Sequence, residues 1–179
     1  MKLIILDRDG VINHDSDAYI KSREEWQPID GSLEAIARLN HGGYTVVVAS
    51  NQSGLARGYF DIETLSSMHM KMDEMLSKLG GQVDAIFYCP HGPDDGCSCR
   101  KPKPGMLLEI GQRFNVSLQD VIFIGDSISD IKAASNANAQ SILVRTGKGV
   151  KAEKILQTEG RDDVPVYDDL DAAVTAIMQ

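Results

Sequence analysis

Cysteine is absent from the whole chain except for one segment, residues 88–99, which holds all three of its cysteines. An odd number of thiols in one short segment argues against a disulfide framework and favours a reducing compartment. Long hydrophobic runs are also absent. None approaches the roughly 18 residues of a membrane span, and the apolar run near the start is too short for a signal peptide. We therefore expect a soluble protein of the cytoplasm with no membrane partner.

Basic residues are in deficit, because 18 Lys and Arg against 26 Asp and Glu leave a net charge of -8. No stripe of Lys and Arg occurs, so nucleic acid is not an expected partner. Repeats, low-complexity tracts and linkers are missing too, and 179 residues suit one domain with one core. We expect residues 1–179 to form a single domain that acts as a monomer.

Short β-branched runs alternate with amphipathic stretches along the chain. The runs predict strands at residues 2–6, 45–50, 85–89, 121–126 and 141–144, and their nearly continuous apolar character suggests burial on both faces. Helical patterns cover residues 32–40, 61–81, 104–114, 130–137 and 170–178, with Ser32 and Asp61 as candidate N-caps. This alternation predicts an α/β fold, a Rossmann-like, doubly wound parallel sheet flanked by helices.

Polar and charged residues follow four of the predicted strands, in the segments DRDG, SNQSG, RKPKPG and GDSISD. Ligands bind at the carboxyl ends of the strands in such folds, so these segments should meet at one edge of the sheet. The residues that could supply chemistry there are Asp7, Asp9, Ser50, Lys101, Lys103, Asp126 and Asp130. Any one of the segments alone could be a solvated turn, but four together predict a site.

The grouped carboxylates favour a Mg²⁺ site. Asp7 and Asp9 are two residues apart, so in an extended segment both can face the same side. Crowded carboxylates repel each other unless a cation intervenes, and Mg²⁺ prefers a few hard oxygen ligands. A nucleophilic carboxylate, a second carboxylate as general acid and base, the Ser50 hydroxyl and a Lys ammonium form a complete phosphoryl-transfer set.

Four segments in this order, LDRDGVIN, SNQSGLARG, CRKPKPGM and GDSISDIKAA, resemble the motifs of the haloacid dehalogenase superfamily of phosphatases. Together with CPHGPDDGCSC, their order and spacing look like the D-glycero-D-manno-heptose 1,7-bisphosphate 7-phosphatase family, over essentially the whole chain. The resemblance implies a Mg²⁺-dependent phosphatase that acts through an aspartyl phosphate. Its expected substrate is a small phosphorylated sugar, a heptose of lipopolysaccharide biosynthesis that is cleaved at the 7-phosphate.

The resemblance also implies roles for individual residues. Asp7 would be the nucleophile and Asp9 the general acid and base, while Ser50 and Lys101 would hold the phosphoryl group. Asp7, Asp126 and the backbone carbonyl of Asp9 would bind Mg²⁺. The residues expected to recognise the substrate are Asp15, Asp17, Tyr19, Asn51, Gln52, Ser53 and Arg100. Ser127 stands where some relatives carry Lys, so no role is carried over to it.

The segment from residue 89 to residue 99 predicts a second metal. Its C-x-H and C-x-C spacings supply four ligands, Cys89, His91, Cys97 and Cys99, which complete a tetrahedral Zn²⁺ site and leave no position for a substrate. We therefore expect a structural zinc that folds this loop and fixes Arg100 and Lys101 beside the active site.

Several alternatives stay open at this stage. The stretch between Asp9 and Ser50 is largely used by a predicted helix and strand, so we expect an open site without a large cap domain. Histidinol-phosphate phosphatase is the closest enzyme alternative, since related domains share the core and a similar zinc loop. A phospho-Asp receiver domain and a zinc-stabilised binding module are the non-enzyme alternatives. Trp26 is assigned to packing, and His69 to packing or to the surface.

Overall fold

The computed structural model describes all 179 residues and contains one six-stranded parallel sheet in the order β3-β2-β1-β4-β5-β6. Its strands are β1 (Lys2–Leu6), β2 (Tyr44–Asn51), β3 (Ala85–Cys89), β4 (Ile122–Gly125), β5 (Gln140–Val144) and β6 (Val166–Tyr167). The five predicted strands and the doubly wound parallel sheet are confirmed. Strand β6 was not predicted, because two residues are too few for a periodic pattern.

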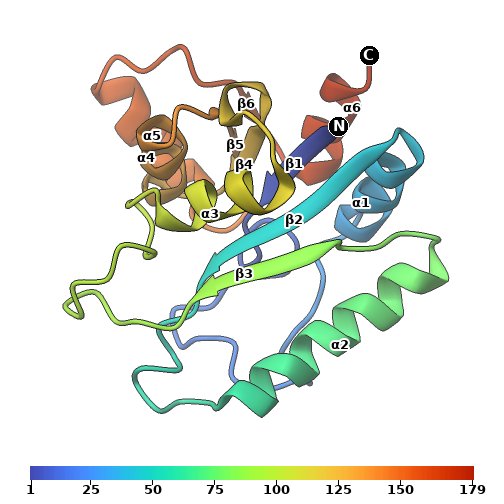
Figure 1. Cartoon of the computed structure of the whole chain (residues 1–179), viewed down its shortest axis with the longest axis vertical. Helices are drawn as coiled ribbons and strands as arrows, with labels where there is room; N and C mark the ends of the chain where they lie inside the picture. Colours follow the sequence, from blue (N-terminus) through green and yellow to red (C-terminus); the bar gives the residue numbers. More distant parts are fainter.

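The helices are α1 (Ser32–His41), α2 (Ile62–Lys78), α3 (Gly105–Phe114), α4 (Ile128–Asn136), α5 (Gly149–Thr158) and α6 (Leu170–Ile177), with a 3₁₀ turn at Leu118–Asp120. They cover the sheet on both sides, and the two chain ends lie near each other at the β1 and α6 end of the molecule (Figure 1). No helix is both long and apolar enough to cross a bilayer. Helix α5 was not predicted.

Strand β1 lies at the centre of the sheet and shows why the two helix layers form. Ile4 and Leu6 pack in one core with buried residues of α1, α2 and α6, and both side chains are fully buried. Leu3 and Ile5 point to the opposite face and pack with α3 and α4. Because successive strand residues face opposite sides, a continuously apolar strand needs helices on both faces.

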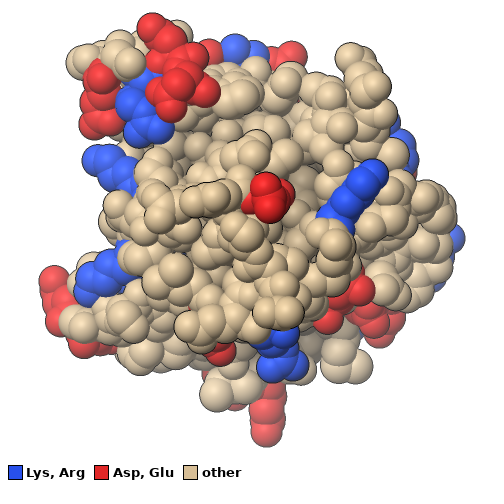
Figure 2. All heavy atoms as spheres, turned by 45° about the horizontal axis from the view of Figure 1, so that its top comes forward, with Lys and Arg blue, Asp and Glu red and all other residues tan.

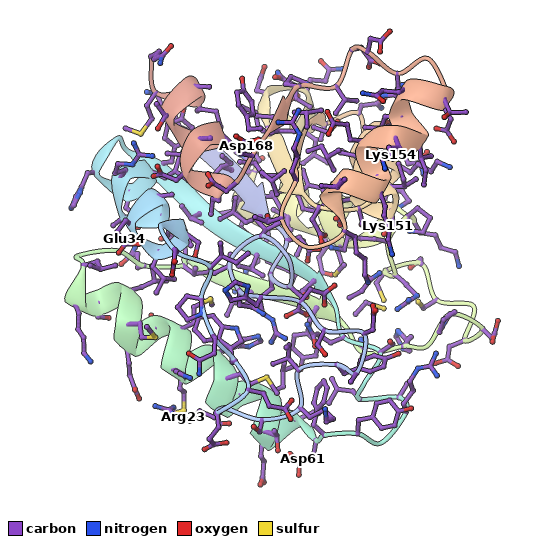
Figure 3. The ribbon with its side chains drawn as sticks, turned by 180° about the vertical axis from the view of Figure 1, so that it is seen from behind. Arg23, Glu34, Asp61, Lys151, Lys154 and Asp168 are labelled. Carbon is purple, nitrogen blue, oxygen red and sulfur yellow. The ribbon has the colours of Figure 1, made fainter.

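The two predicted N-caps have different outcomes. Asp61 caps α2, since its side chain accepts a hydrogen bond from the Thr64 amide at 2.7 Å, and it marks the start of that helix in Figure 3. The Ser32 assignment is wrong, because Gly31 is the N-cap of α1 and Ser32 is its first helical residue. The Ser32 hydroxyl instead donates to the Ile12 carbonyl oxygen at 2.6 Å, a distant partner that a local pattern cannot reveal.

The segment between β1 and α1 runs across the edge of α2 and belongs to the main body of the protein. Trp26 is fully buried in the larger core cluster, which confirms its packing role. Arg23 reaches α2, where its guanidinium donates to Glu74 Oε2 at 2.6 Å and to the Ser67 carbonyl oxygen at 3.1 Å (Figure 3). This stretch is therefore packed on the core, and no separate cap domain is built from it.

Candidate active site

The carboxyl ends of the strands surround a cavity of about 320 Å³. Eleven of the predicted site residues line it, and they are Asp7, Asp9, Asp15, Asp17, Tyr19, Asn51, Gln52, Ser53, Arg100, Lys101 and Asp126. The lining holds six carboxylates against three cationic side chains, Arg100, Lys101 and Lys148. The cavity is thus acidic and suited to a divalent cation.

On the face drawn in Figure 2, Lys and Arg are scattered between acidic residues and form no stripe.

Asp7 lies directly after β1 and is mostly buried. Its Oδ1 accepts from the Arg8 amide at 2.7 Å and lies 3.0 Å from the Lys101 ammonium. Burial raises the pKa of Asp7 well above its ordinary value, the charge of Asp130 adds to this, and Lys101 opposes it. A buried carboxylate among other acids requires cationic charge to stay ionised, which is the form a nucleophile needs.

Lys101 is the most deeply buried of the three cations that line the cavity. Its ammonium contacts Asp7 Oδ1 at 3.0 Å, Asp130 Oδ1 at 2.7 Å and the Ala49 carbonyl oxygen at 2.8 Å. Burial lowers the pKa of Lys101, but the charges of Asp130 and Asp7 outweigh that effect and raise the pKa above its usual value. The side chain is therefore charged throughout the neutral range, at a point where it can meet a phosphoryl oxygen.

Asn51 fixes the backbone of Lys101. The side-chain nitrogen of Asn51, Nδ2, donates to the Lys101 carbonyl oxygen, and the Lys101 backbone amide donates to Asn51 Oδ1, both at 3.1 Å. This paired contact joins the end of β2 to the segment that follows the cysteines. Asn51 was predicted to touch substrate, and the structure gives it this backbone contact as well.

Asp126 follows β4 and points into the site between two glycines. A Cβ built on Gly10 would lie 2.0 Å from Asp126 Oδ2, and one built on Gly147 would lie 2.1 Å from it. The same oxygen accepts from the Lys148 amide at 2.8 Å. Burial raises the pKa of Asp126 to about 7, and the charge of Asp130 adds to the shift. Both glycine positions thus have to be bare for the carboxylate to occupy its place.

The carboxylate oxygens of Asp7, Asp126 and Asp130 lie within 4.8 Å of one another. Raised pKa values for Asp7 and Asp126 indicate that no protein cation fully compensates them, so the donor set fits a hard divalent cation such as Mg²⁺. Asp130 completes this triplet, but its side chain also accepts from the Asp126 and Ser127 amides, as the third residue of a capping box in which Ser127 is the N-cap of α4. It therefore has a structural function that the sequence analysis left undefined.

The carboxylate of Asp9 is held apart from this triplet. Its Oδ1 accepts from the Arg8 guanidinium at 2.8 and 3.0 Å and from Asn13 Nδ2 at 2.8 Å, while Oδ2 accepts from Gln52 Nε2 at 2.9 Å. Burial raises the pKa of Asp9, but the Arg8 charge and these hydrogen bonds outweigh it and lower the pKa overall. The two acids of the DRDG segment therefore have opposite electrostatic environments.

Ser50 lies at the end of β2 and is almost fully buried. Its hydroxyl oxygen accepts from Gln52 Nε2 at 2.8 Å, and the same amide group also reaches Asp9. Ser50 is the one predicted catalytic residue that does not line the cavity surface. Gln52 therefore links the hydroxyl to the acid and base candidate beneath the cavity.

Lys148 is a charged rim residue that the sequence analysis missed. Lys148 precedes α5, lines the cavity and lies 3.4 Å from Asp15 Oδ2 across its mouth. Lys148 lies in the loop after β5. Ligands bind at the carboxyl ends of the strands in such folds, so the same argument that grouped the other residues would have found Lys148. On the same rim, Tyr19 has a positive φ of 68° and its ring stacks against Tyr59 with centroids 5.0 Å apart.

The four zinc-ligand candidates come together in the loop after β3. The ligand atoms of Cys89, His91, Cys97 and Cys99 all lie within 4.8 Å of one another. The Cys89 sulfur is 3.1 Å from that of Cys99 and 3.6 Å from that of Cys97. Zinc–sulfur bonds of about 2.3 Å in a tetrahedron separate two sulfurs by about 3.8 Å. The Cys89–Cys97 distance is near that value and the Cys89–Cys99 distance is shorter, while the S₃N donor set is one that zinc prefers.

Comparison with known proteins adds independent findings. A family model described as HAD-hydrolase-like matches residues 98–173. The chain is 54% identical to the D-glycero-β-D-manno-heptose-1,7-bisphosphate 7-phosphatase of Pseudomonas aeruginosa, over 99% of this chain and 98% of that protein. It is 53% identical to the enzyme of the same name from Bordetella bronchiseptica, over 100% and 99% of the two chains.

Solved structures give the same result. The crystal structure of the D,D-heptose 1,7-bisphosphate phosphatase from B. bronchiseptica, complexed with magnesium and phosphate, superposes with a TM-score of 0.95 at 52% identity. The match covers 100% of this chain and 99% of that one. The corresponding phosphatase from Burkholderia thailandensis gives a TM-score of 0.78 at 40% identity, with 100% and 99% covered.

Proposed function

Because the chain belongs to the D-glycero-β-D-manno-heptose-1,7-bisphosphate 7-phosphatase family of the HAD superfamily, we propose that it hydrolyses the 7-phosphate of that heptose bisphosphate. The observation that carries the proposal is the joint position of Asp7, Lys101 and Asp126 on one cavity, with Asp9 beside them. These groups supply a nucleophile, cationic charge, a metal site and a proton donor. The histidinol-phosphate alternative is not favoured by the named relatives, and the phosphatase names argue against both non-enzyme alternatives.

In the first step, an Asp7 carboxylate oxygen attacks the phosphorus atom, and the bond from phosphorus to the C7 oxygen breaks. With the anionic phosphate bound beside it, which opposes the effect of the Arg8 charge, Asp9 carries a proton and gives it to that leaving oxygen, so the products are the heptose 1-phosphate and an aspartyl phosphate on Asp7. Lys101, only 3.0 Å from Asp7, supplies fixed positive charge where the phosphoryl oxygens must lie. Ser50 is assigned to donate its hydroxyl hydrogen to the same group.

In the second step, water attacks the phosphorus atom and the bond to Asp7 breaks. Asp9 takes the proton that the water loses, which releases inorganic phosphate and returns both acids to their starting state. Asp7, Asp126 and the Asp9 carbonyl oxygen are assigned to hold Mg²⁺, whose charge, when it is bound, offsets that of the phosphoryl oxygens. A solved relative complexed with magnesium and phosphate supports this assignment.

Recognition of the rest of the substrate is assigned to the rim. Residues 15–19, Asn51 to Ser53 and Arg100 line the cavity mouth, and Arg100 and Lys148 are its two cations not held in the buried Asp7–Lys101 cluster. A second phosphate carries negative charge that these two side chains can meet. We therefore place the phosphate that is not cleaved toward Arg100 and Lys148.

The Cys/His loop is assigned a structural zinc. Four soft or borderline ligands fill a tetrahedral site without an open position, so the ion would stabilise the loop and take no part in turnover. The loop continues directly into Arg100 and Lys101, so its order bears on the catalytic cation. We also propose that residues 1–179 act as one phosphatase domain in the cytoplasm. We propose further that the protein is a monomer, which light scattering of the purified protein tests.

Steady-state release of phosphate from the β-anomer of heptose bisphosphate, the α-anomer and histidinol phosphate tests the function. We expect the heptose bisphosphate to have the highest kcat/KM, and position-specific NMR of the product to show loss of the 7-phosphate. Higher kcat/KM on histidinol phosphate, or loss of the 1-phosphate, would contradict the proposal. The Asp7→Asn protein is the control for contaminating phosphatases.

A further inference from the structure

Arg8 is an unusual residue to find between two catalytic acids, since its side chain is fully buried. Arginine is almost never fully buried unless its charge is paired. Here its Nε and Nη2 donate to Asp9 Oδ1 at 3.0 and 2.8 Å. Its Nη1 points the other way, toward α2, where it lies 3.2 Å from His69 Nε2 and 3.8 Å from the Met68 sulfur. The guanidinium therefore bridges the catalytic loop and the middle of α2.

His69 is the partner that holds the far end of Arg8. A guanidinium has only hydrogen-bond donors, so His69 Nε2 has to accept and the ring hydrogen belongs on Nδ1. Burial lowers the pKa of His69 to about 4, with a further contribution from the Arg8 charge, which keeps the ring neutral. No functional role for His69 could be predicted from the sequence, because its partner is 61 positions away.

The two oxygens of Asp9 differ because of this arrangement. Oδ1 accepts three N–H groups, two from Arg8 and one from Asn13, which saturates it on the protein side. Oδ2 accepts only from Gln52 Nε2, which itself lines the cavity. A carboxyl group bound in this way has its plane fixed and one oxygen left for the reacting atoms.

We infer that Arg8, braced by His69, is a positioning residue that fixes the carboxyl of Asp9 with Oδ2 as the oxygen that exchanges a proton with the leaving group. The inference rests on the proposed function, in which Asp9 protonates the C7 oxygen. Arg8 does not reach the cavity, so it acts only through Asp9. Proton transfer from a positioned acid contributes about 10² to 10⁴ in rate, and a displaced acid loses part of that factor.

The choice of leaving group separates positioning of Asp9 from a mere anchor for α2. An alkoxide such as the C7 oxygen has to be protonated as its bond to phosphorus breaks, whereas p-nitrophenolate leaves readily without a proton. Because kcat/KM reports steps up to formation of the aspartyl phosphate, a defect in Asp9 placement affects heptose bisphosphate and spares p-nitrophenyl phosphate. Loosening of the fold lowers kcat/KM for both.

The experiment measures kcat/KM on both substrates for Arg8→Met, His69→Leu and His69→Gln, together with their thermal melting. Asp9→Asn is the benchmark for loss of the acid, and Met70→Leu, at an exposed position of α2, is the matched control. Glutamine can place an acceptor oxygen where His69 Nε2 lies, and leucine cannot. The His69 pair therefore decides the question even if Arg8→Met does not fold.

For Arg8→Met we expect about a 10²-fold loss on heptose bisphosphate and less than about a fivefold loss on p-nitrophenyl phosphate. His69→Leu should lose about tenfold on the bisphosphate alone, and His69→Gln should stay within about twofold of the parent. Equal losses on both substrates, or identical behaviour of His69→Leu and His69→Gln, would overturn the inference while the proposed function stands. If Asp9→Asn itself shows no dependence on the leaving group, the proposed role of Asp9 fails, and the inference fails with it.

Discussion

Replacing Gly10 by alanine tests whether the position of Asp126 controls the chemistry. The new Cβ would lie 2.0 Å from Asp126 Oδ2, where real Cβ contacts essentially never fall below 3.0 Å, so the carboxylate has to move by at least about 1 Å. A misplacement of about 1 Å in a positioning group costs on the order of 10² in rate. The displaced oxygen also loses its hydrogen bond from the Lys148 amide.

The backbone conformation adds a separate effect that a control variant can remove. Gly10 has a φ of +86°, and alanine in the left-handed region costs roughly 1–2 kcal/mol. Gly43 has a similar φ of +81° with nothing within 4 Å of its would-be Cβ, and it lies between α1 and β2, at the other end of the sheet from the site. Gly43→Ala therefore carries the conformational cost alone.

The assay is phosphate release as a function of Mg²⁺ concentration, alongside thermal melting. Both variants should be destabilised by the positive φ that they share, and Gly10→Ala further by the displaced carboxylate, but only Gly10→Ala should lose about 10² in kcat/KM and need more Mg²⁺. Gly147→Ala, whose Cβ would meet the same oxygen at 2.1 Å from another loop, should reproduce the defect. If Gly10→Ala and Gly43→Ala have the same kcat/KM and Mg²⁺ dependence, Asp126 is not a metal ligand whose place matters.

Three further outcomes are expected. Asp7→Asn should abolish turnover at an unchanged melting temperature, because an amide cannot form the acyl phosphate, and measurable activity in a pure sample would refute the nucleophile assignment. The contribution of His69 to the free energy of unfolding should fall by about 3 kcal/mol as the pH drops from 6.5 to 4, because its folded pKa is about 4 and its unfolded form takes up a proton in that window. Asp7 and Asp126, whose pKa values are raised, act in the opposite direction, so the contribution is the difference between the denaturation curves of the parent and of His69→Gln, and curves with the same pH dependence would exclude it. Cys99→Ser should release zinc and lower kcat/KM by about 10² while the sheet stays folded, since Lys101 follows the loop directly; circular dichroism that shows global unfolding would make the loop part of the core.

The sheet and most of the cavity could be predicted from the sequence for a definite physical reason. A central parallel strand is buried on both faces, so β1, β2 and β4 are nearly continuous apolar runs, and their shortness favours strands over buried helices. Once the strands are placed, their carboxyl ends must share one edge. Asp7, Ser50, Lys101 and Asp126 could therefore be grouped without knowledge of any distance.

Other features depend on contacts that leave no local signal. Helix α5 begins at Gly149, and the side chain of its N-cap residue Lys148 makes no capping hydrogen bond, so no N-cap pattern marks its start and the rim residue was overlooked. From the sequence alone, Arg8 resembles a solvated charge between two acids, because its contact with His69 depends on the position of α2. Ser32 has the residue type of an N-cap, but its hydroxyl donates to the Ile12 carbonyl oxygen, a partner that lies outside any local pattern. Each of these positions is defined by a partner distant in sequence.

The strand order also determines when each strand can pair with its neighbours during synthesis. Strand β1 is synthesised before β4, yet Ile5 pairs with Phe123, so β1 lacks its second neighbouring strand until β4 has been made. Until β4 emerges, one hydrogen-bonding edge of β1 and its apolar side chains lack their partners, which is a condition that invites aggregation. Pairing across so long a stretch of chain closes slowly. Nascent chains stalled before β4 should consequently be without the Mg²⁺ site and depend on chaperones, and the enzyme becomes competent only after β4 and Asp126 have been synthesised.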